Sequence, residues 1–323
     1  MTDSAVSWGL GTVASVTPVA DGVVAVDIYI DTQTRHATPG AHVDVRVDDG
    51  TVRSYSVVSS GEGGRSITVA VRLSPTSRGG SRFMHALVPG DRLEISAPIQ
   101  NFPLRVGAPR YLLLAGGIGI TAIAAMATTL RRVGAEYRLL HVGRSRAAMP
   151  FVSELIAAHG DRLSLHVDAE GTGLNISDLV DSVEPTTELY MCGPVRMMDA
   201  VRRAWTGRDL PPADLRYETF GNSGWFDVEP FRVVVPRLGI ETTVGVGESM
   251  LDALERAGAD MMYDCRKGEC GLCQVDIIHV DGKVDHRDVF FSESQKRTCT
   301  KVCTCVSRVA NAGDTGILAL DIP

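Results

Sequence analysis

The cysteines of this 323-residue chain are concentrated near its C-terminus, where six of the seven lie between Cys265 and Cys305. Cys265, Cys270 and Cys273 follow the pattern C-x4-C-x2-C, which is the spacing of plant-type [2Fe-2S] ferredoxins. Two glycines inside this loop allow the backbone to turn where a Cβ would clash, and they leave N–H groups free to face the sulfurs. The spacing therefore predicts three thiolate ligands of a [2Fe-2S] cluster.

Zinc is the competing interpretation of the same cysteines. Structural zinc sites usually present two C-x2–4-C pairs or a mixture of Cys and His. This loop has a single C-x2-C pair and no paired histidines after it, so an iron–sulfur cluster is favoured over zinc or inert thiols. A fourth thiolate must come from elsewhere, and the cysteines that follow are Cys299, Cys303 and Cys305.

Composition excludes several classes of protein. The formal net charge is -7, and residues 231–323 carry 11 Lys and Arg against 14 Asp and Glu, which leaves 21 against 25 for the rest. Neither part offers the basic surface that nucleic acids need. The clustered cysteines differ from an extracellular disulfide framework, which favours a reducing, cytoplasmic setting.

One segment is long and apolar enough to raise the question of a membrane span. Residues 111–130 contain no charged side chain, and about 20 apolar residues can cross a bilayer. Its glycines divide the segment into a short strand and an Ala-rich helix, as in a buried βα unit. The N-terminus also lacks the features of a signal peptide, so we expect no membrane association.

Residues 1–105 consist of short apolar runs separated by turn residues. Their period of two predicts a small antiparallel β-barrel with one short helix near Ser81 to Leu87. Within it, the run Arg53-Ser54-Tyr55-Ser56 puts Arg53 and Tyr55 on one side of a strand. A flat ring could lie on Tyr55 beside a phosphate held by Arg53, although an ordinary exposed strand is the simpler interpretation.

A second polar run strengthens the prediction of a phosphate site. Residues 77–81, Ser-Arg-Gly-Gly-Ser, open the predicted short helix. Free backbone N–H groups and the positive end of the helix dipole attract anions there. Gly79, Gly80 and Ser81 are therefore predicted to bind a phosphate, with a glycine-rich hairpin as the alternative.

Residues 106–222 alternate between strand-like and helical segments, which predicts a parallel sheet with helices on both faces. Ligands of such sheets bind outside the carboxyl ends of the strands. Three short runs of candidate residues follow strand ends in this part of the chain. Each run alone could be explained by packing of a helix on a strand, and Gly-Gly-Ile-Gly departs from G-x-G-x-x-G. Together the three runs predict a nicotinamide dinucleotide site. The candidates are Gly116, Gly117, Gly119 and Thr121 after the first strand, Arg144, Ser145 and Arg146 after the second, and Cys192, Gly193 and Pro194 after the fourth.

The C-terminal part predicts a ferredoxin-like β-grasp domain, because two hairpins there enclose one helix from Met250 to Arg256. Ser249 and Asp252 form a capping-box pattern at the start of that helix. The predicted fold is thus a multidomain α/β and β chain. Its parts are an antiparallel barrel (1–105), for which the resemblance described next implies flavin binding, a parallel-sheet nucleotide-binding domain (106–222), a linker (223–230) and a plant-type [2Fe-2S] ferredoxin domain (231–323).

Taken together, these motifs resemble those of the phthalate dioxygenase reductase family, including vanillate O-demethylase reductases. The resemblance covers essentially the whole chain and implies an FMN-binding barrel, an NADH-binding domain and a C-terminal [2Fe-2S] domain that supply electrons to a terminal oxygenase. The motifs are Arg53-x-Tyr55-Ser56, Gly79-Gly80-Ser81, Gly116 to Thr121, Cys192-Gly193-Pro194, Glu218-x-Phe220-Gly221, the cysteine loop, Asp285-His286-Arg287-Asp288 and Cys305-Val306-Ser307-Arg308.

The resemblance also implies roles for individual residues. Cys305 stands before Val-Ser-Arg, as the fourth ligand does in the family, whereas Cys303 gives a separation close to that of plant ferredoxins; we prefer Cys305 and regard Cys299 as a spare thiol. Cys192 would face the nicotinamide or be only a small buried residue. FMN would contact Arg53, Ser54, Tyr55, Ser56, Ala70, Val71, Gly79, Gly80 and Ser81, with Thr121 and Phe220 near its ring.

The predicted cofactors suit an electron relay. Hydride carries two electrons, whereas a [2Fe-2S] cluster accepts one at a time, and a flavin can take two and release them singly. We therefore predict a monomeric reductase that passes electrons from NADH through FMN and the cluster to a Rieske non-haem iron oxygenase or a cytochrome P450 acting on an aromatic or similar small compound. The alternatives are an FAD-dependent reductase, use of NADPH through Arg144 or Arg146, and a non-catalytic iron–sulfur redox sensor.

Overall fold

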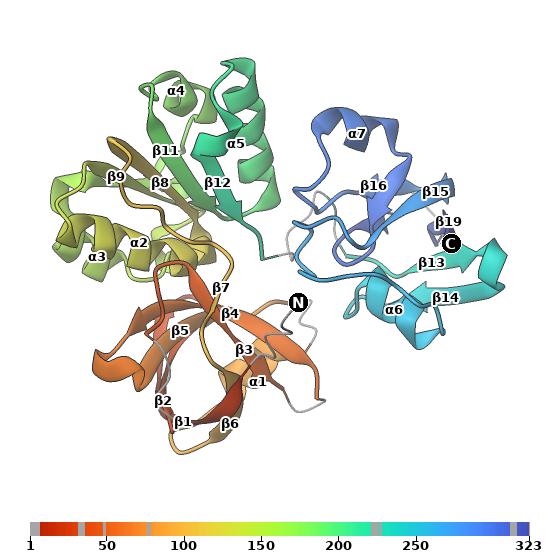
Figure 1. Ribbon diagram of the computed structural model, residues 1–323, viewed down its shortest axis with the longest axis horizontal. Helices are drawn as coiled ribbons and strands as arrows, with labels where there is room; N and C mark the ends of the chain where they lie inside the picture. The colour runs from red at the N-terminus through yellow and green to blue at the C-terminus, as the bar shows by residue number, and fades with distance from the viewer. Residues whose placement is uncertain are drawn as a thin grey trace. The chain divides into compact units, whose positions relative to one another are not determined.

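The computed structural model describes residues 7–31, 36–47, 50–75, 79–220, 226, 228–310 and 315–322. The chain forms two compact units, shown in Figure 1. The first unit comprises Met1–Gly193 and Ala204–Glu218, and the second comprises Pro194–Arg203 and Thr219–Pro323. The predicted domain boundaries at residues 105, 222 and 230 stay predictions.

A closed six-stranded antiparallel barrel forms one part of the first unit, and it confirms the predicted barrel and its short helix. The strand order is β4-β5-β2-β1-β6-β3, and β3 also pairs with β4 to close the ring, while β7 adds to β3. Alternate residues such as Val26, Ile28 and Val43 fill the interior, as a period of two requires. The elements are β1 (Trp8–Ala20), β2 (Val23–Ile30), β3 (Ala41–Arg46), β4 (Val52–Ser60), β5 (Ser66–Arg72), α1 (Gly80–Ala86), β6 (Arg92–Ser96) and β7 (Ile99–Gln100).

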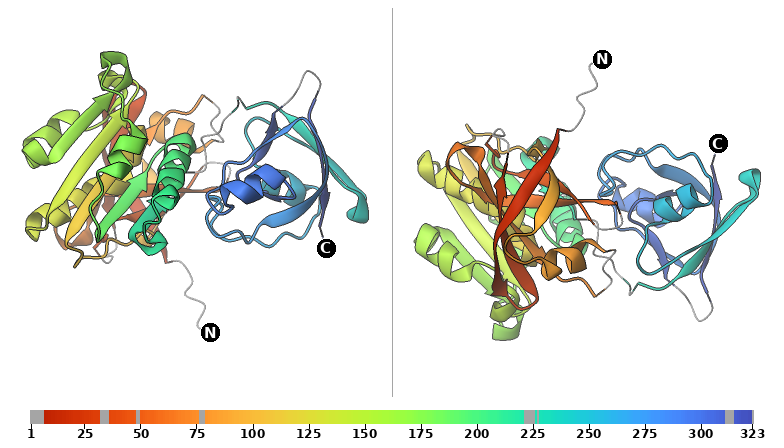
Figure 2. Two further views of the ribbon diagram at one scale, coloured as in Figure 1. Left: turned by 90° about the horizontal axis from the view of Figure 1, so that it is seen from above. Right: turned by 90° about the horizontal axis from the view of Figure 1, so that it is seen from below.

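A five-stranded parallel sheet forms the other part of the first unit, with the strand order β10-β9-β8-β11-β12. Helices α2 and α3 lie on one face and α4 on the other (Figure 1; a second view is in Figure 2), as expected for right-handed crossovers. The elements are β8 (Arg110–Gly116), α2 (Ile120–Arg132), β9 (Tyr137–Gly143), α3 (Val152–His159), β10 (Leu163–Val167), α4 (Ile176–Asp181), β11 (Thr187–Cys192), α5 (Val195–Gly207) and β12 (Leu215–Glu218).

The uncharged segment 111–130 falls on β8 and α2, which confirms the predicted βα unit. Of the helices in the described ranges, none is long and apolar enough to span a membrane. The chain order reverses between β8 and β11, so the carboxyl ends of these two strands border the topological switch point where such sheets bind ligands.

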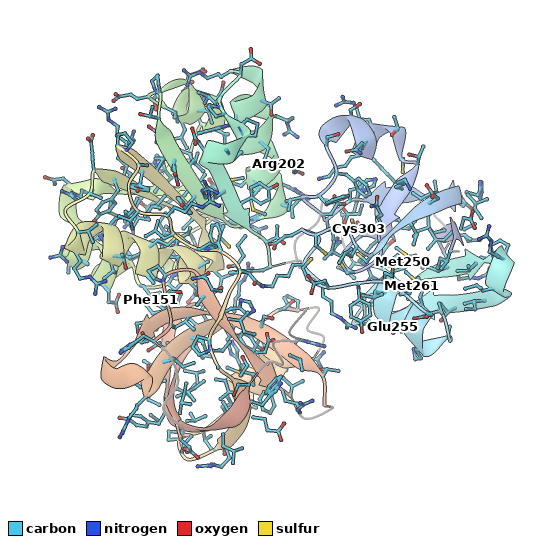
Figure 3. All side chains as sticks on the ribbon, viewed as in Figure 1. Phe151, Arg202, Met250, Glu255, Met261 and Cys303 are labelled. Atoms are coloured by element: carbon cyan, nitrogen blue, oxygen red, sulfur yellow. The ribbon has the colours of Figure 1, made fainter. Side chains whose placement is uncertain are left out.

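The second unit contains a five-stranded sheet of order β14-β13-β19-β15-β17 and a small ribbon of β16 and β18. The predicted hairpin of β13 and β14 and the helix α6 are confirmed, and the Ser249–Asp252 capping box is present. The other two predicted strands, β15 and β19, pair antiparallel but are not a hairpin, because β16, α7, β17 and β18 lie between them in the chain. Its buried core includes Met250, Met261 and Cys303 (Figure 3). The elements are β13 (Phe231–Val235), β14 (Ile240–Val244), α6 (Met250–Arg256), β15 (Gln274–Asp281), β16 (Lys283–Asp285), α7 (Glu293–Thr298), β17 (Lys301–Cys303), β18 (Arg308–Ala310) and β19 (Ile317–Asp321).

The contact between Gly119 and the end of β11 gives a test of the first unit. A Cβ at Gly119 would lie 2.1 Å from the carbonyl oxygen of Cys192, so the backbone would have to shift. We expect Gly119→Ala to lower the free energy of unfolding by about 2 kcal/mol. Gly207→Ala is the matched control, since a Cβ there meets nothing within 4 Å. Urea unfolding midpoints measure both, and equal midpoints would contradict the expectation.

Candidate functional site

The cysteine loop directs backbone N–H groups at one sulfur. The amides of Lys267, Glu269 and Cys270 each donate to Sγ of Cys265 at 3.4 Å. The turn uses left-handed backbone angles at Gly268 (φ 77°) and Gly271 (φ 73°), where a side chain would be strained. Such donors stabilise a thiolate, so this part of the loop fits an anionic iron–sulfur cluster.

The described cysteines lie in two groups. Cys265 is hydrogen-bonded to Cys270, and Cys273 is hydrogen-bonded to Cys303 and Cys305. Hydrogen bonds from the thiols of Cys303 and Cys305 lower the pKa of Cys273 to about 3. Among the residues that the structure describes, no three His, Cys, Asp or Glu side chains are placed to hold one metal ion. Two groups of thiols suit two irons, because each iron of a [2Fe-2S] cluster takes two protein ligands.

Cys303 and Cys305 have different surroundings, although both are buried. Cys305 interacts electrostatically with Cys265 as well as Cys273, and it accepts a hydrogen bond from the Gly268 N–H. Cys303 lies on β17 and interacts with Cys273, Cys305 and the carboxylate of Asp288, which help to raise its pKa. Cys305 thus interacts with both groups of thiols. Cys299 is half-buried at the end of α7.

The Asp285-His286-Arg287-Asp288 motif lies directly under the cysteine loop. A Cβ at Gly268 would be 2.9 Å from the Cα of Asp288, and the Val289 N–H donates to the Gly268 carbonyl oxygen at 2.9 Å. Arg287 forms a buried ion pair with Asp285 at 2.7 Å. This close packing explains why a glycine is needed at position 268.

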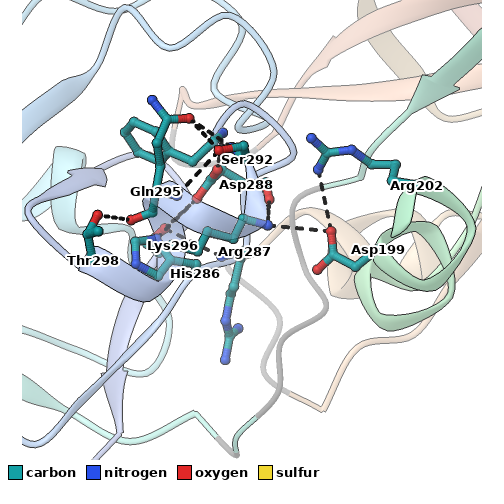
Figure 4. Close-up of polar contacts among 11 residues, drawn as sticks. Asp199, Arg202, His286, Arg287, Asp288, Ser292, Gln295, Lys296 and Thr298 are labelled. Carbon is teal, nitrogen blue, oxygen red and sulfur yellow. Dashed lines mark hydrogen bonds and ion pairs between the residues drawn. The ribbon is translucent and has the colours of Figure 1, made fainter. Parts of the chain in front are cut away.

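Asp288 is fully buried and organises the chain that follows the motif (Figure 4). The carboxylate of Asp288 accepts the Phe291 N–H at 2.9 Å and lies 3.5 Å from Nδ1 of His286. Lys296 Nζ donates to the backbone carbonyl oxygen of Asp288 at 2.7 Å. Burial by itself would raise the pKa of Asp288, but the polar contact with the His286 ring, the charge of Lys296 and the Phe291 N–H lower it.

The structure brings together two of the predicted flavin motifs in the barrel. A Cβ at Gly80 would lie 2.7 Å from Cγ of Arg53 and 2.8 Å from the hydroxyl oxygen of Tyr55. Any side chain at position 80 would therefore clash with Arg53 and Tyr55. Burial raises the pKa of Tyr55, so its phenol is neutral. Ser77 and Arg78 of the predicted phosphate site lie outside the described residues.

The other predicted flavin residues of the barrel each have local contacts of their own. The Ser54 hydroxyl donates to Asp44 at 2.6 Å and is exposed, on the other side of the strand from Tyr55. Ala70 and Val71 are buried in β5, and the carbonyl oxygen of Val71 is 2.9 Å from Nε2 of His85. The remaining two are Gly79, which has φ 88°, and Ser81, whose hydroxyl accepts the Ser74 N–H at 3.1 Å.

The strand that carries Arg53 and Tyr55 contacts the parallel sheet within the first unit. The Ser56 hydroxyl donates to Oε2 of Glu218, at the carboxyl end of β12, over 3.4 Å, and β4 packs against α2. Thr121, near the start of α2, is buried and donates to the Ile118 carbonyl oxygen at 2.9 Å. The first unit thus joins the candidate flavin strand to the candidate nucleotide edge.

The glycine loop after β8 is supported by a histidine that sequence analysis missed. His141 is fully buried, and its Nε2 is 3.2 Å from the carbonyl oxygen of Gly117. Burial lowers the pKa of His141 to about 4, so the ring is neutral at pH 7. A polar residue between the apolar Leu140 and Val142 near the end of the strand was the signal that could have identified it.

The structure places the other nucleotide candidates at the expected strand ends. Gly116 ends β8, Arg144 and Ser145 follow β9, and Cys192 ends β11 with Gly193 and Pro194 after it. Arg146 is paired with Glu170, 2.8 Å away, which follows β10 and which sequence analysis also missed. Phe220 is half-buried in the second unit, and Gly221 lies outside the described residues.

A closed antiparallel barrel, a parallel sheet with a glycine loop at its switch point and a ferredoxin-type cysteine loop define a flavin- and iron–sulfur-dependent oxidoreductase that uses a pyridine nucleotide. Residues 234–310 match the model of the 2Fe-2S iron-sulfur cluster binding domain. The chain belongs to the phthalate dioxygenase reductase family of oxygenase reductase components.

Several relatives establish this membership. The chain is 36% identical to a putative toluene-4-sulfonate monooxygenase system reductase subunit of Comamonas testosteroni, over 96% of this chain and 98% of the relative. It is 34% identical to the heme-dependent oxidative N-demethylase beta subunit of Ectopseudomonas mendocina, over 83% and 85% of the two chains.

Two solved structures share the fold over 98% of this chain. Phthalate dioxygenase reductase matches with a TM-score of 0.73 and 29% identity, over 98% of its own chain. A full-length cytochrome P450 from Tepidiphilus thermophilus matches with a TM-score of 0.67 and 34% identity, and there the match spans 42% of the P450 chain.

The buried carboxylate of Asp288 gives a pH-dependent test. Its pKa is lowered in the folded protein, so its charge stabilises the fold above about pH 4, and this stabilisation is lost as the pH falls through the folded-state pKa. We expect Asp288→Asn to lower the free energy of unfolding by about 3 kcal/mol at pH 7, and by less below pH 4.

The control for this variant is Ser292→Ala, which removes only the cap of α7. It should cost about 1 kcal/mol with little dependence on pH. Denaturant unfolding of both variants between pH 3 and about 7 provides the measurement. A cost for Asp288→Asn that stays constant over this range would show that the carboxylate charge contributes nothing.

Proposed function

We propose that this chain takes electrons from NADH by way of FMN held in the barrel, and passes them singly through a [2Fe-2S] cluster to a terminal oxygenase. The observation that carries the proposal is the junction in the first unit, where the strand bearing Arg53, Tyr55 and Ser56 meets α2 and the carboxyl edge of the parallel sheet. A flavin supplies the conversion of a two-electron hydride transfer into single-electron transfers.

The barrel residues would hold and orient the flavin. Arg53 supplies a cation for the phosphate, and the half-buried ring of Tyr55 supplies a flat apolar surface beside it. Gly79, Gly80 and Ser81 would bind the phosphate through backbone N–H groups and a hydroxyl, and the resemblance of these motifs favours FMN over FAD. Ser54, Ser56, Ala70, Val71 and Thr121 complete the proposed flavin site in the first unit.

The edge of the parallel sheet would bind the nicotinamide dinucleotide. Gly116, Gly117 and Gly119 bring backbone close to a pyrophosphate at the start of α2, where N–H groups and the helix dipole favour anions. The neutral His141 ring would fix the orientation of this loop through its hydrogen bond with the carbonyl oxygen of Gly117. The remaining proposed contacts are Arg144 and Ser145 at the ribose and Cys192, Gly193 and Pro194 at the nicotinamide.

We propose Cys265, Cys270, Cys273 and Cys305 as the cluster ligands. Cys305 is supported over Cys303 because it also interacts with Cys265 and receives the Gly268 N–H. Cys303, fully buried beside Cys273, would remain a thiol. The corresponding domains are proposed to be 1–105 for FMN, 106–222 for NADH and 231–323 for the cluster, joined by the linker 223–230.

The partner is an oxygenase, and we propose a Rieske non-haem iron oxygenase or a cytochrome P450 that acts on an aromatic or similar small compound. The relatives named as subunits of monooxygenase systems support a separate partner. The P450 chain that contains a matching module supports a haem acceptor as the second possibility. We further propose that the chain acts as a cytoplasmic monomer.

The ligand assignment predicts opposite outcomes for two neighbouring cysteines. Cys305→Ala should remove a ligand of the [2Fe-2S] cluster. The visible absorption of the cluster and the electron paramagnetic resonance (EPR) signal of its reduced form should then both be lost. Cys303→Ala should retain both signals with two irons per chain. Iron and acid-labile sulfide analysis measures the content, and Cys299→Ala is the control for removal of a thiol. Loss of the cluster in Cys303→Ala but not in Cys305→Ala would reverse the assignment.

The electron relay predicts a direct assay. The purified protein should reduce cytochrome c rapidly with NADH, and the flavin released by acid should comigrate with FMN. Cys265→Ser should leave reduction of the flavin by NADH intact while abolishing the reduction of cytochrome c that depends on the cluster. No reduction of cytochrome c by protein with a filled cluster and bound flavin would favour the redox sensor, and release of FAD would correct the flavin assignment.

A further inference from the structure

Two loops that are far apart in the sequence meet at one edge of the parallel sheet. Strands β9 and β10 pair in parallel, with Val167 beside Gly143, so the segments that follow them lie together. The Ala169 N–H donates to the carbonyl oxygen of Arg144 at 2.9 Å and connects the two loops. Any ligand that reaches the end of β9 therefore also meets the residues that follow β10.

The side chains of these loops form a two-point ion pair. Nε of Arg146 donates to Oε1 of Glu170 at 3.0 Å, and Nη2 donates to Oε2 at 2.8 Å. This is the geometry by which a guanidinium binds a carboxylate or a phosphate. Glu170 thus occupies the donors with which Arg146 would bind a phosphate.

The charges of the two loops also cancel. Residues 144–148 carry Arg144 and Arg146, and residues 168–172 carry Asp168 and Glu170. A phosphomonoester with a charge of about -2 finds no surplus of positive charge there. A ribose hydroxyl, in contrast, can donate a hydrogen bond to a carboxylate.

The position of this acid differs from the usual pattern. In many dinucleotide-binding folds an acidic residue at the end of the second strand binds the ribose 2′-hydroxyl. Here the corresponding strand, β9, is followed by Arg144, Ser145 and Arg146. The structure instead brings an acid to this place from the next strand, 24 residues beyond Arg146.

We propose that Glu170, by pairing with Arg146, is the specificity-determining residue that makes the site select NADH over NADPH. The inference rests on the proposed function, because it requires a dinucleotide at this edge of the sheet. Removing the carboxylate charge would release Arg146 for the 2′-phosphate. The pair is exposed, and such pairs contribute little to stability, so the variant should fold normally.

The test measures nucleotide binding to the full-length protein directly. Isothermal titration calorimetry with 2′,5′-ADP and 5′-ADP gives an affinity ratio that does not depend on flavin or cluster content. We expect Glu170→Gln to raise the ratio in favour of 2′,5′-ADP at least tenfold. The double variant Glu170→Gln/Arg146→Gln should return the ratio to that of the unchanged protein, because the released guanidinium is then absent.

A matched control removes a similar acid from the opposite edge of the sheet. Glu184 forms an exposed ion pair with Arg110, at the start of β8, and Glu184→Gln should leave the ratio unchanged. An unchanged ratio in Glu170→Gln, with normal flavin reduction by NADH, would overturn the inference and leave the proposed function intact. Absence of binding of either nucleotide to the unchanged protein would overturn both.

Discussion

The candidate iron–sulfur site depends on three backbone N–H groups that converge on one sulfur atom. The amides that surround Sγ of Cys265 can do so only because the loop turns through left-handed residues, among them Gly268 and Gly271. The turn packs against Asp288, whose backbone lies so close to Gly268 that position 268 cannot carry a side chain. A short-range requirement of the cluster is therefore met by the backbone of a buried residue 20 positions further along the chain.

Close backbone approach also organises the first unit. Gly119 lies against the carbonyl oxygen of Cys192, and Gly80 lies against Arg53 and Tyr55. Each of these glycines is where two motifs from different parts of the sequence meet. The candidate flavin and nucleotide residues thus converge because the positions between them carry no side chain, and the Ser56–Glu218 hydrogen bond connects the two regions.

Much of this architecture was predictable because its elements have clear periodicity. The alternation in β2 and β5 and the strand–helix alternation from β8 to β12 predicted the barrel and the parallel sheet. The strands β16, β17 and β18 and the helix α7 were missed. Each of these strands has only three residues and the helix only six, which is too short to show a hydrophobic periodicity. His141 was missed because it stands between the apolar Leu140 and Val142, and Glu170 because it follows the neighbouring strand.

The sequence alone determined the types of chemistry: the thiol spacing from Cys265 to Cys273, the glycine loop after β8 and the cation and ring at Arg53 and Tyr55. These depend on residues a few positions apart, whose relative placement follows from local backbone geometry. Only the tertiary structure decided that Cys305 interacts with both groups of thiols, and which acid faces Arg146. Those relations join segments about 25 or more residues apart, and pairing and packing of strands, rather than spacing along the chain, bring them together.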